Sequence, residues 1–350
     1  MDFSLLLHFL RFDIRSRSLD LEPWLRQLYR SNDLRAEFPE RRPRLELWVE
    51  RADGPQALAI AAPGQATFTE SVLCYGRCYY GDGRFHSAHH GGYWHEIEYD
   101  PRAHRIRANV AGAYLDSGQF AVVYFVRPLL NSFILPFYGL KALHGAVLGR
   151  AERTVFLAGS GGAGKSTAAA QLLRAGWDLL GDDAPLFTLR DGRALALASL
   201  DYLHVTRATL RLYPELEAGV IGVADHKDKF AVDPDRVGRG FARAPRPVTH
   251  VVRLRRGAAA ARPAVVPLDR RAVLRDLLGE AMTVFRPAVF HREADGFRRS
   301  SEFIFDIARA LVRDASAYEL HYDDRHLAEL PEILARLPAA GTAPGDTVGS

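Results

Sequence analysis

Val155-Phe156-Leu157-Ala158-Gly159-Ser160-Gly161-Gly162-Ala163-Gly164-Lys165-Ser166-Thr167 decides the fold, because an apolar run leads directly into the pattern G-x-x-x-x-G-K-S. The run predicts a strand, the glycines predict a tight loop, and the residues from Lys165 onward predict a helix. Such a loop points consecutive backbone N–H groups at an anion, and the helix adds the positive end of its dipole. The stretch therefore predicts a phosphate-binding loop.

The residues of this loop have distinct expected roles toward a nucleotide. The backbone cradles the phosphates, Lys165 reaches the outer phosphates, and the Ser166 hydroxyl is a ligand for Mg²⁺. We therefore predict that the chain binds ATP or GTP together with magnesium. The predicted nucleotide-binding residues are Gly159, Ser160, Gly161, Gly162, Ala163, Gly164, Lys165, Ser166 and Thr167.

Two adjacent carboxylates follow the next predicted strand. The pair Asp182-Asp183 begins seventeen residues after Lys165, directly after an apolar run. In phosphate-loop enzymes, a carboxylate at such a strand end faces the metal and the transferring phosphate. Two carboxylates can divide the work, because one can hold Mg²⁺ or its water while the other accepts the proton of an attacking hydroxyl. The spacing leaves open which aspartate takes which role.

A histidine precedes the loop. His144 lies fifteen residues before Gly159, in an apolar run over 143–148 that predicts a strand. Taken alone, such a histidine is most often a core residue with satisfied hydrogen bonds. Together, however, Leu143-His144-Gly145, the loop and the stretch from Gly176 to Asp183 resemble the catalytic domain of HPr kinase/phosphorylase. The resemblance extends to the wider group of HPr-kinase-like proteins, including those of lasso-peptide gene clusters.

This resemblance covers residues from about 140 to 190 well, and the remainder to about 338 only in general layout. It implies an α/β protein with a P-loop kinase core of HPr-kinase type, which moves the γ-phosphoryl group of a nucleotide to a serine-type hydroxyl of a protein or peptide. It also implies that Asp182 is the base and that Asp183 and His144 are its polar support. The expected catalytic residues are therefore Asp182, Asp183, His144 and Lys165, and the expected metal ligands are Ser166 and Asp183.

One motif of the family is missing. The glycine-rich, Glu-containing signature of true HPr kinases has no good match in the stretch 216–223. The absence of this signature favours the divergent HPr-kinase-like proteins over true HPr kinases. A lasso-type precursor peptide is then a candidate acceptor. A small-molecule kinase with the same core and a non-catalytic nucleotide-binding regulator are the alternatives. The pair Asp182-Asp183 favours an enzyme, since a pure binder has no need of a spare base.

The rest of the chain predicts two domains and a tail. Its 350 residues, 48% of them hydrophobic and 25% charged, are enough for sizeable cores. Period-two alternation predicts an N-terminal β-rich domain over 1–126. Mixed strand and helix patterns predict the kinase domain over 127–338. Small and polar residues predict a disordered tail over 339–350.

Composition limits the expected partners. The formal net charge of +4 is mild, which is not the signature of a nucleic-acid-binding protein. No stretch is long and apolar enough to span a bilayer, and the N-terminal residues lack the pattern of a signal peptide. We therefore expect a cytoplasmic protein that acts on a peptide or protein carrying an acceptor hydroxyl, with no nucleic acid or membrane as partner. Association into a homo-oligomer stays open.

Lysine is scarce in this chain. Of the 46 Lys and Arg residues only four are lysines, so a retained lysine indicates a need for a compact ammonium. Lys227 and Lys229, in the mixed-charge stretch 225–230, are candidates for contact with phosphate, and a solvated turn is the alternative. The arginine-rich stretch from Arg236 to Arg246 predicts a mobile loop that closes on the transferring phosphate or holds an acidic peptide. An exposed connection is the alternative there.

Overall fold

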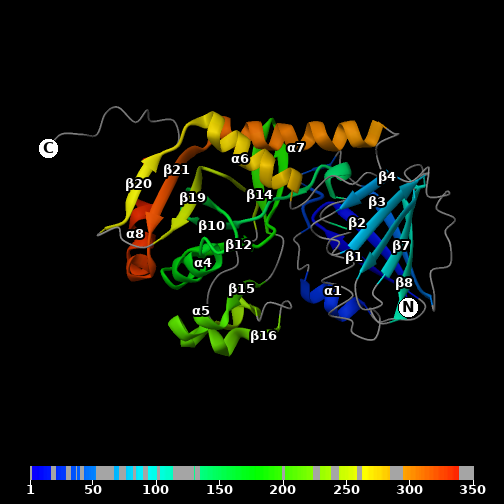
Figure 1. Cartoon of the computed structure of the whole chain (residues 1–350), viewed down its shortest axis with the longest axis horizontal. Helices are drawn as coiled ribbons and strands as arrows, with labels where there is room; N and C mark the ends of the chain where they lie inside the picture. Colours follow the sequence, from blue (N-terminus) through cyan, green and yellow to red (C-terminus); the bar gives the residue numbers. More distant parts are fainter. Residues whose placement is uncertain are drawn as a thin grey trace. The chain divides into compact units, whose positions relative to one another are not determined.

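The computed structural model describes residues 2–16, 21–28, 33–36, 38–39, 43–52, 67–70, 76–81, 84–89, 94–100, 103–112, 130, 135–198, 202–223, 229–237, 244–257, 262–283 and 295–338. These residues form a mixed α/β protein with several sheets (Figure 1). The chain divides into two compact units, Met1–Leu140 with Met282–Phe303 and Lys141–Ala281 with Ile304–Ser350. The division after Leu140 differs from the boundary expected after residue 126. The tail expected over 339–350 lies outside the described residues.

An eight-stranded sheet makes up most of the described part of the first unit. Its order is β1-β2-β3-β8-β7-β6-β5-β4, and β3 runs parallel to both β2 and β8. The strands are β1 Asp2–Leu7, β2 Leu10–Ser16, β3 Arg44–Ala52, β4 Thr67–Glu70, β5 Gly76–Gly81, β6 Arg84–His89, β7 Trp94–Asp100 and β8 Arg105–Ala111. The helix α1 Glu22–Leu28 and the 3-10 helix η4 Leu135–Tyr138 belong to the same unit.

The described part of the second unit contains three sheets. Their orders are β12-β10-β11-β19-β21-β20, β18-β14-β13-β9 and β15-β17-β16. The strands are β9 Lys141–Ala142, β10 Ala146–Arg150, β11 Arg153–Ala158, β12 Asp178–Asp182, β13 Leu186–Arg190, β14 Arg193–Leu197, β15 Leu203–Thr206, β16 Val220–Val223, β17 Lys229–Val232, β18 Arg246–Pro247, β19 His250–Arg256, β20 Ala264–Pro267 and β21 Ser316–Tyr322. The helices are α4 Lys165–Arg174, α5 Arg207–Leu212, η5 Pro214–Gly219, η6 Pro234–Val237, α6 Arg270–Thr283, α7 Asp295–Asp314, η8 Asp324–Glu329 and α8 Leu330–Ala335, of which α6 and α7 cross the unit boundary.

Strand direction in the six-stranded sheet gathers several loops at one edge. β11, β19 and β21 are parallel to one another, and β10 is antiparallel to both of its neighbours, β11 and β12. β12 therefore runs in the same direction as β11. The carboxyl ends of β12, β11, β19 and β21 thus lie at the same edge of the sheet, which is where ligands bind in open α/β sheets.

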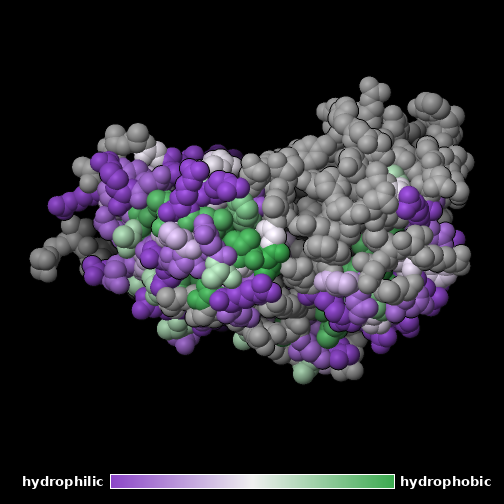
Figure 2. Space-filling model, turned by 90° about the horizontal axis from the view of Figure 1, so that it is seen from below, coloured by the Kyte–Doolittle hydropathy of each residue, from purple (hydrophilic) through white to green (hydrophobic). Residues whose placement is uncertain are grey.

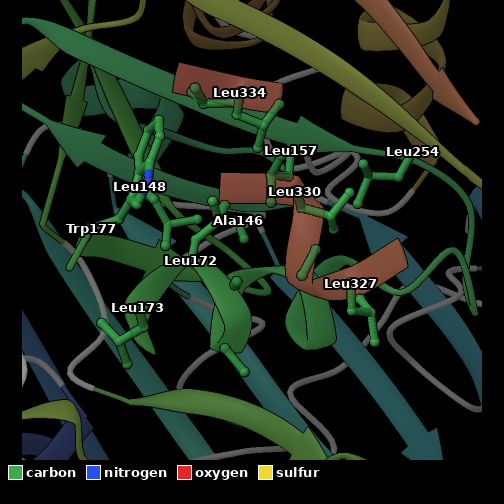
Figure 3. Packing of buried hydrophobic residues seen from close by; sticks show 14 of the residues in the cluster. Ala146, Leu148, Leu157, Leu172, Leu173, Trp177, Leu254, Leu327, Leu330 and Leu334 are labelled. Atoms are coloured by element: carbon green, nitrogen blue, oxygen red, sulfur yellow. The ribbon is translucent and has the colours of Figure 1, made fainter. Parts of the chain in front are cut away.

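The core of the second unit lies between this sheet and the helices α4 and α8. In Figure 3, Leu172 of α4 lies near Leu148 of β10, and Leu157 of β11 lies near Leu330 and Leu334 of α8. Each of these leucines is at most 1% exposed. Burying one such side chain contributes about 1.5–3 kcal/mol. This packing fixes α4 on the sheet, and with α4 it fixes the loop that precedes the helix.

Two segments differ from their predicted structure. The strand expected over 143–148 starts only at Ala146, so His144 lies in a bend between β9 and β10 rather than on a strand. The bend occurs where the backbone of Gly145 packs closely, since a Cβ there would lie 2.5 Å from the Leu157 carbonyl oxygen. The loop expected over 225–230 is also shorter, because Lys229 begins the strand β17. Residues 225–228 lie outside the described residues.

The described surface is mainly polar. In the view of Figure 2, hydrophobic residues gather between hydrophilic ones. Among the described residues, the large hydrophobic side chains that are exposed are Leu212, Val265, Val266 and Phe305. Within the same part of the chain, every helix is too short or too polar to cross a membrane.

Candidate functional site

The loop between β11 and α4 has one open side and one packed side. A Cβ added at Gly161 or Gly162 would meet no atom within 4 Å, so a ligand can approach these backbone groups. At Gly164 a Cβ would lie 2.3 Å from the Tyr322 hydroxyl, and the backbone has φ 84°. Only glycine adopts that conformation without strain and leaves room for the tyrosine. The loop is therefore open at Gly161 and Gly162 and fixed at Gly164.

Lys165 and Ser166 begin α4 directly behind the loop. Nζ of Lys165 donates hydrogen bonds to the carbonyl oxygens of Gly159 at 2.6 Å and Ser160 at 3.1 Å, so the ammonium lies against the loop. Oγ of Ser166 donates to Oδ1 of Asp182 at 3.2 Å. This contact joins the phosphate loop to the carboxyl end of β12.

Asp182 is a buried carboxylate with a partner on each oxygen. The residue is only 1% exposed. Its Oδ2 accepts a hydrogen bond from the backbone N–H of His204 at 2.8 Å. Burial and the nearby charge of Asp183 raise the pKa of Asp182 to about 6, although its hydrogen bonds oppose the rise. The carboxylate is therefore ionised at neutral pH and is basic enough to accept a proton.

Asp183 occupies a strained turn. Its φ is 66°, and the N–H of Ala184 donates to the carbonyl oxygen of Asp182 at 2.8 Å across it. A three-residue turn with a left-handed, non-glycine central residue is rare, and strain of this kind occurs mostly at functional sites. The turn leaves Asp182 buried and the side chain of Asp183 partly exposed at the same edge of the sheet.

His144 supports this turn from the bend before β10. Its Nδ1 donates to the carbonyl oxygen of Asp183 at 3.2 Å and lies 3.7 Å from the Oδ1 of that residue. Burial lowers the pKa of His144, and the charge of Lys165 lowers it further, while Asp183 raises it. The imidazole is therefore neutral at neutral pH and holds the turn by hydrogen bonding.

The packed side of the loop is held by groups that the sequence analysis did not identify. The hydroxyl of Tyr322, at the end of β21, donates to the carbonyl oxygen of Ala163 at 2.8 Å. Close by, Arg256 at the end of β19 forms an ion pair with Asp324. No sequence signal distinguishes Tyr322 from other tyrosines at strand ends, since it lies 159 residues from the loop that it contacts.

The structure brings the predicted site residues to one edge of the sheet. His144, the loop from Gly159 to Thr167 and the pair Asp182-Asp183 all lie there. Arg246 does not, because its Nη2 donates to the Ala151 carbonyl oxygen at 2.7 Å, in the turn at the far end of β11. Arg236 lies 3.6 Å from the carboxylate of Asp233. Lys227, Arg239 and Arg243 lie outside the described residues.

The donor set at the edge fits magnesium. Within the described ranges, no group of three or more His, Cys, Asp or Glu side chains is arranged to hold a metal ion. Mg²⁺ does not need such a cage, because it keeps several waters and binds through one or two carboxylates together with phosphate oxygens. Ser166, Asp182 and Asp183 offer oxygen ligands of this kind next to the anion cradle.

Comparison with known proteins finds distant likeness to solved structures. No family model matches the chain, and no curated protein matches it in sequence. Among solved structures, the chain is similar to the HPr(Ser) kinase/phosphatase from Coxiella burnetii. The two chains are 12% identical, the match covers 56% of this chain and 94% of that chain, and the TM-score is 0.29. A TM-score of this size supports no functional assignment, so the proposal below uses the geometry of the site alone.

Proposed function

We propose that this chain is a magnesium-dependent phosphotransferase, a kinase that transfers the γ-phosphoryl group of ATP or GTP to a serine-type hydroxyl of a peptide or protein. The observation that carries the proposal is the contact between Ser166 and Asp182. This contact supports the proposal because it joins a buried carboxylate to the first turn of the helix behind the predicted phosphate-binding loop. A protein that only bound nucleotide would need one carboxylate for the metal but no second, buried carboxylate, whose ionised form is destabilised by burial.

Each residue has a defined part in the transfer. The loop amides and Lys165 hold the nucleotide phosphates, and Ser166 and Asp183 hold the metal. Mg²⁺, when bound, neutralises charge on the phosphate oxygens. Asp182 takes the proton of the acceptor hydroxyl, and His144 positions Asp183. The bond between γ-phosphorus and the bridging oxygen breaks as the bond to the acceptor oxygen forms. The products are the phosphorylated acceptor and a nucleoside diphosphate.

The same contact also supports an exchange of roles between the two aspartates. If Asp182 shares the metal with Ser166, then Asp183 is the base. A magnesium series on Asp182→Asn and Asp183→Asn separates the two assignments. The variant that lacks the metal ligand should need more magnesium for half-maximal rate. The variant that lacks the base should have a lower rate at every magnesium concentration.

The acceptor is found by direct assay. The purified protein is incubated with ATP or GTP, magnesium and a panel of acceptors that includes lasso-type precursor peptides and small hydroxyl compounds. Mass spectrometry then measures the gain of one phosphoryl group. We expect the gain on a peptide serine, and its loss in Lys165→Ala. A gain on small compounds alone would make the protein a small-molecule kinase. Nucleotide binding without any turnover would make it a regulator.

A further inference from the structure

Lys229 has no part in the mechanism described so far. It is the first residue of β17, it is partly exposed, and its pairing partner on β15 is Thr206. Among the residues that the structure describes, Lys229 forms no ion pair with a carboxylate, unlike Arg174, Arg253 and Arg256. Its position can be traced from the strands that carry it to the reaction site.

The three-stranded sheet reaches the reaction site through β15. The backbone N–H of His204, two residues before Thr206, donates a hydrogen bond to Oδ2 of Asp182. The hydroxyl of Ser166 donates a hydrogen bond to Oδ1 of the same carboxylate. The Asp182 side chain is thus held between the phosphate loop on one oxygen and the three-stranded sheet on the other.

Hydroxyl contacts fix this sheet to the helix behind the phosphate loop. Oγ1 of Thr167, on α4, lies 2.9 Å from Oγ1 of Thr209 on α5. Thr206 caps α5, because its hydroxyl accepts a hydrogen bond from the backbone N–H of Thr209 at 3.3 Å. The strand residue that pairs with Lys229 is therefore tied to the start of α4.

Strand geometry brings Lys229 close to the carboxylate. Two residues along a strand span about 6.6 Å, which separates Thr206 from His204. Paired residues on neighbouring antiparallel strands lie about 5 Å apart, which separates Lys229 from Thr206. The flexible four-carbon stem of a lysine is long enough to cover much of the remaining distance.

The charge of Lys229 acts on two site residues from different elements. The pKa of Asp182 is raised mainly by burial and then by Asp183, and Lys229 opposes the rise. The pKa of His144 is lowered mainly by burial and then by Lys165, and Lys229 lowers it further. The ammonium of Lys229 is therefore within electrostatic range of both groups.

We propose that Lys229 is a second cation of the transfer site, whose ammonium contacts the γ-phosphoryl group beside Asp182. This proposal rests on the proposed function. During transfer, negative charge is spread over three phosphoryl oxygens. Lys165 faces that charge from the loop, but the acceptor side presents the carboxylates of Asp182 and Asp183. Lys229 offsets their repulsion there, and its compact ammonium can follow the group as it moves.

The test compares three variants of the full chain. Lys229→Met removes the charge and keeps the length of the side chain, whereas Lys229→Arg keeps the charge. Arg207→Ala is the matched control, because it removes a cation from the same region, where the guanidinium lies 5.1 Å from the ring centroid of Phe230. For each protein, calorimetry with magnesium and a non-hydrolysable ATP or GTP analogue gives the nucleotide affinity. Release of phosphate from ATP or GTP, with water as the acceptor, gives kcat and KM.

We expect Lys229→Met to lower kcat about 10- to 100-fold, the size of one charge-assisted contact made during transfer, with nucleotide affinity within about threefold. Lys229→Arg should recover part of the loss, and Arg207→Ala should match the wild type. A wild-type kcat in Lys229→Met would overturn the proposal, as would equal losses in Lys229→Met and Lys229→Arg. If the wild type itself shows no magnesium-dependent turnover with water or with any acceptor, the proposed function fails, and this proposal fails with it.

Discussion

The two flanks of the phosphate loop are built from different chemistry. On the flank at β12, Asp182 is buried with a raised pKa, Asp183 sits in a left-handed turn, and His144 is kept neutral. On the flank at β19 and β21, Tyr322 donates to the loop backbone and Arg256 pairs with Asp324. The burial of Asp182 and the left-handed backbone of Asp183 on the first flank both reduce the free energy of unfolding. The second flank is made of satisfied contacts.

This difference indicates how the site divides its work. Strain and a buried charge reduce stability, so they persist where function requires them. Satisfied hydrogen bonds and ion pairs hold a backbone in one conformation. We infer that the flank at β12 carries out the chemistry and that the flank at β21 keeps the loop in its binding conformation. Substitutions on the two flanks should therefore have opposite effects on stability.

The largest effect on nucleotide binding is expected where the loop meets the packed flank. Gly164→Ala puts a Cβ 2.3 Å from the Tyr322 hydroxyl and forces a side chain into the left-handed region. The backbone term alone costs about 1–2 kcal/mol, and the clash displaces the loop further. We expect nucleotide affinity to fall about 10- to 100-fold by calorimetry. Gly192→Ala is the control, since its backbone is also left-handed, a Cβ there meets nothing within 4 Å, and it lies in the turn between β13 and β14. An equal loss of nucleotide affinity in both variants would contradict the role given to packing against Tyr322.

On the flank at β12, the second-largest expected effect is a gain of stability in Asp182→Asn. The pKa of Asp182 is raised to about 6 in the folded protein, above the unfolded value of 3.8, so ionisation is less favourable after folding. The wild type therefore loses stability as pH rises from about 4 to about 6. Asp182→Asn lacks this loss, and we expect it to be more stable at pH 7 by on the order of 2 kcal/mol.

Urea denaturation at pH 4 and pH 7 checks this prediction. The two proteins should have similar free energies of unfolding at pH 4 and should diverge at pH 7. A variant that is less stable than the wild type at pH 7 would show that the hydrogen bonds from Ser166 and His204 outweigh the cost of burying the charge.

The smallest effect concerns the tyrosine that anchors the loop. Tyr322→Phe removes one hydroxyl and leaves the Ala163 carbonyl oxygen without that donor. The loss of one neutral hydrogen bond is about 1 kcal/mol, so nucleotide affinity should fall roughly fivefold and stability should fall slightly. Tyr318→Phe, on the same strand, is the control. An unchanged affinity in Tyr322→Phe would separate the β21 flank from nucleotide binding.

The sequence predicted the parts of the site that are local. The loop, its flanking strand and helix, and the pair Asp182-Asp183 follow from short-range pattern, and the structure has them where they were expected. The prediction that His144 lies on a strand was wrong. Residues 144–145 form a bend at the closely packed Gly145, and the strand starts at Ala146. Short apolar patterns do not show where a strand begins when the packing partner is distant in sequence.

Long-range contacts could not be predicted. Tyr322 reaches the loop from a strand far along the chain, and the three-stranded sheet places Lys229 by pairing β17 with β15. Four-residue strands give too little periodicity to distinguish them from a polar loop. The expected arginine loop failed for Arg246 for the same reason, since only the tertiary structure shows that this residue contacts the far end of β11.

In the proposed mechanism, Asp182 takes part in phosphoryl transfer and not in nucleotide binding. The most direct test of this role is the single-turnover rate of γ-phosphoryl transfer by the wild type and Asp182→Asn, both saturated with magnesium and nucleotide. An amide oxygen is too weak a base to take the hydroxyl proton, so the rate should fall on the order of 10²–10⁴ while nucleotide affinity stays the same. A rate within a few-fold of the wild type, at equal nucleotide affinity, would contradict the account.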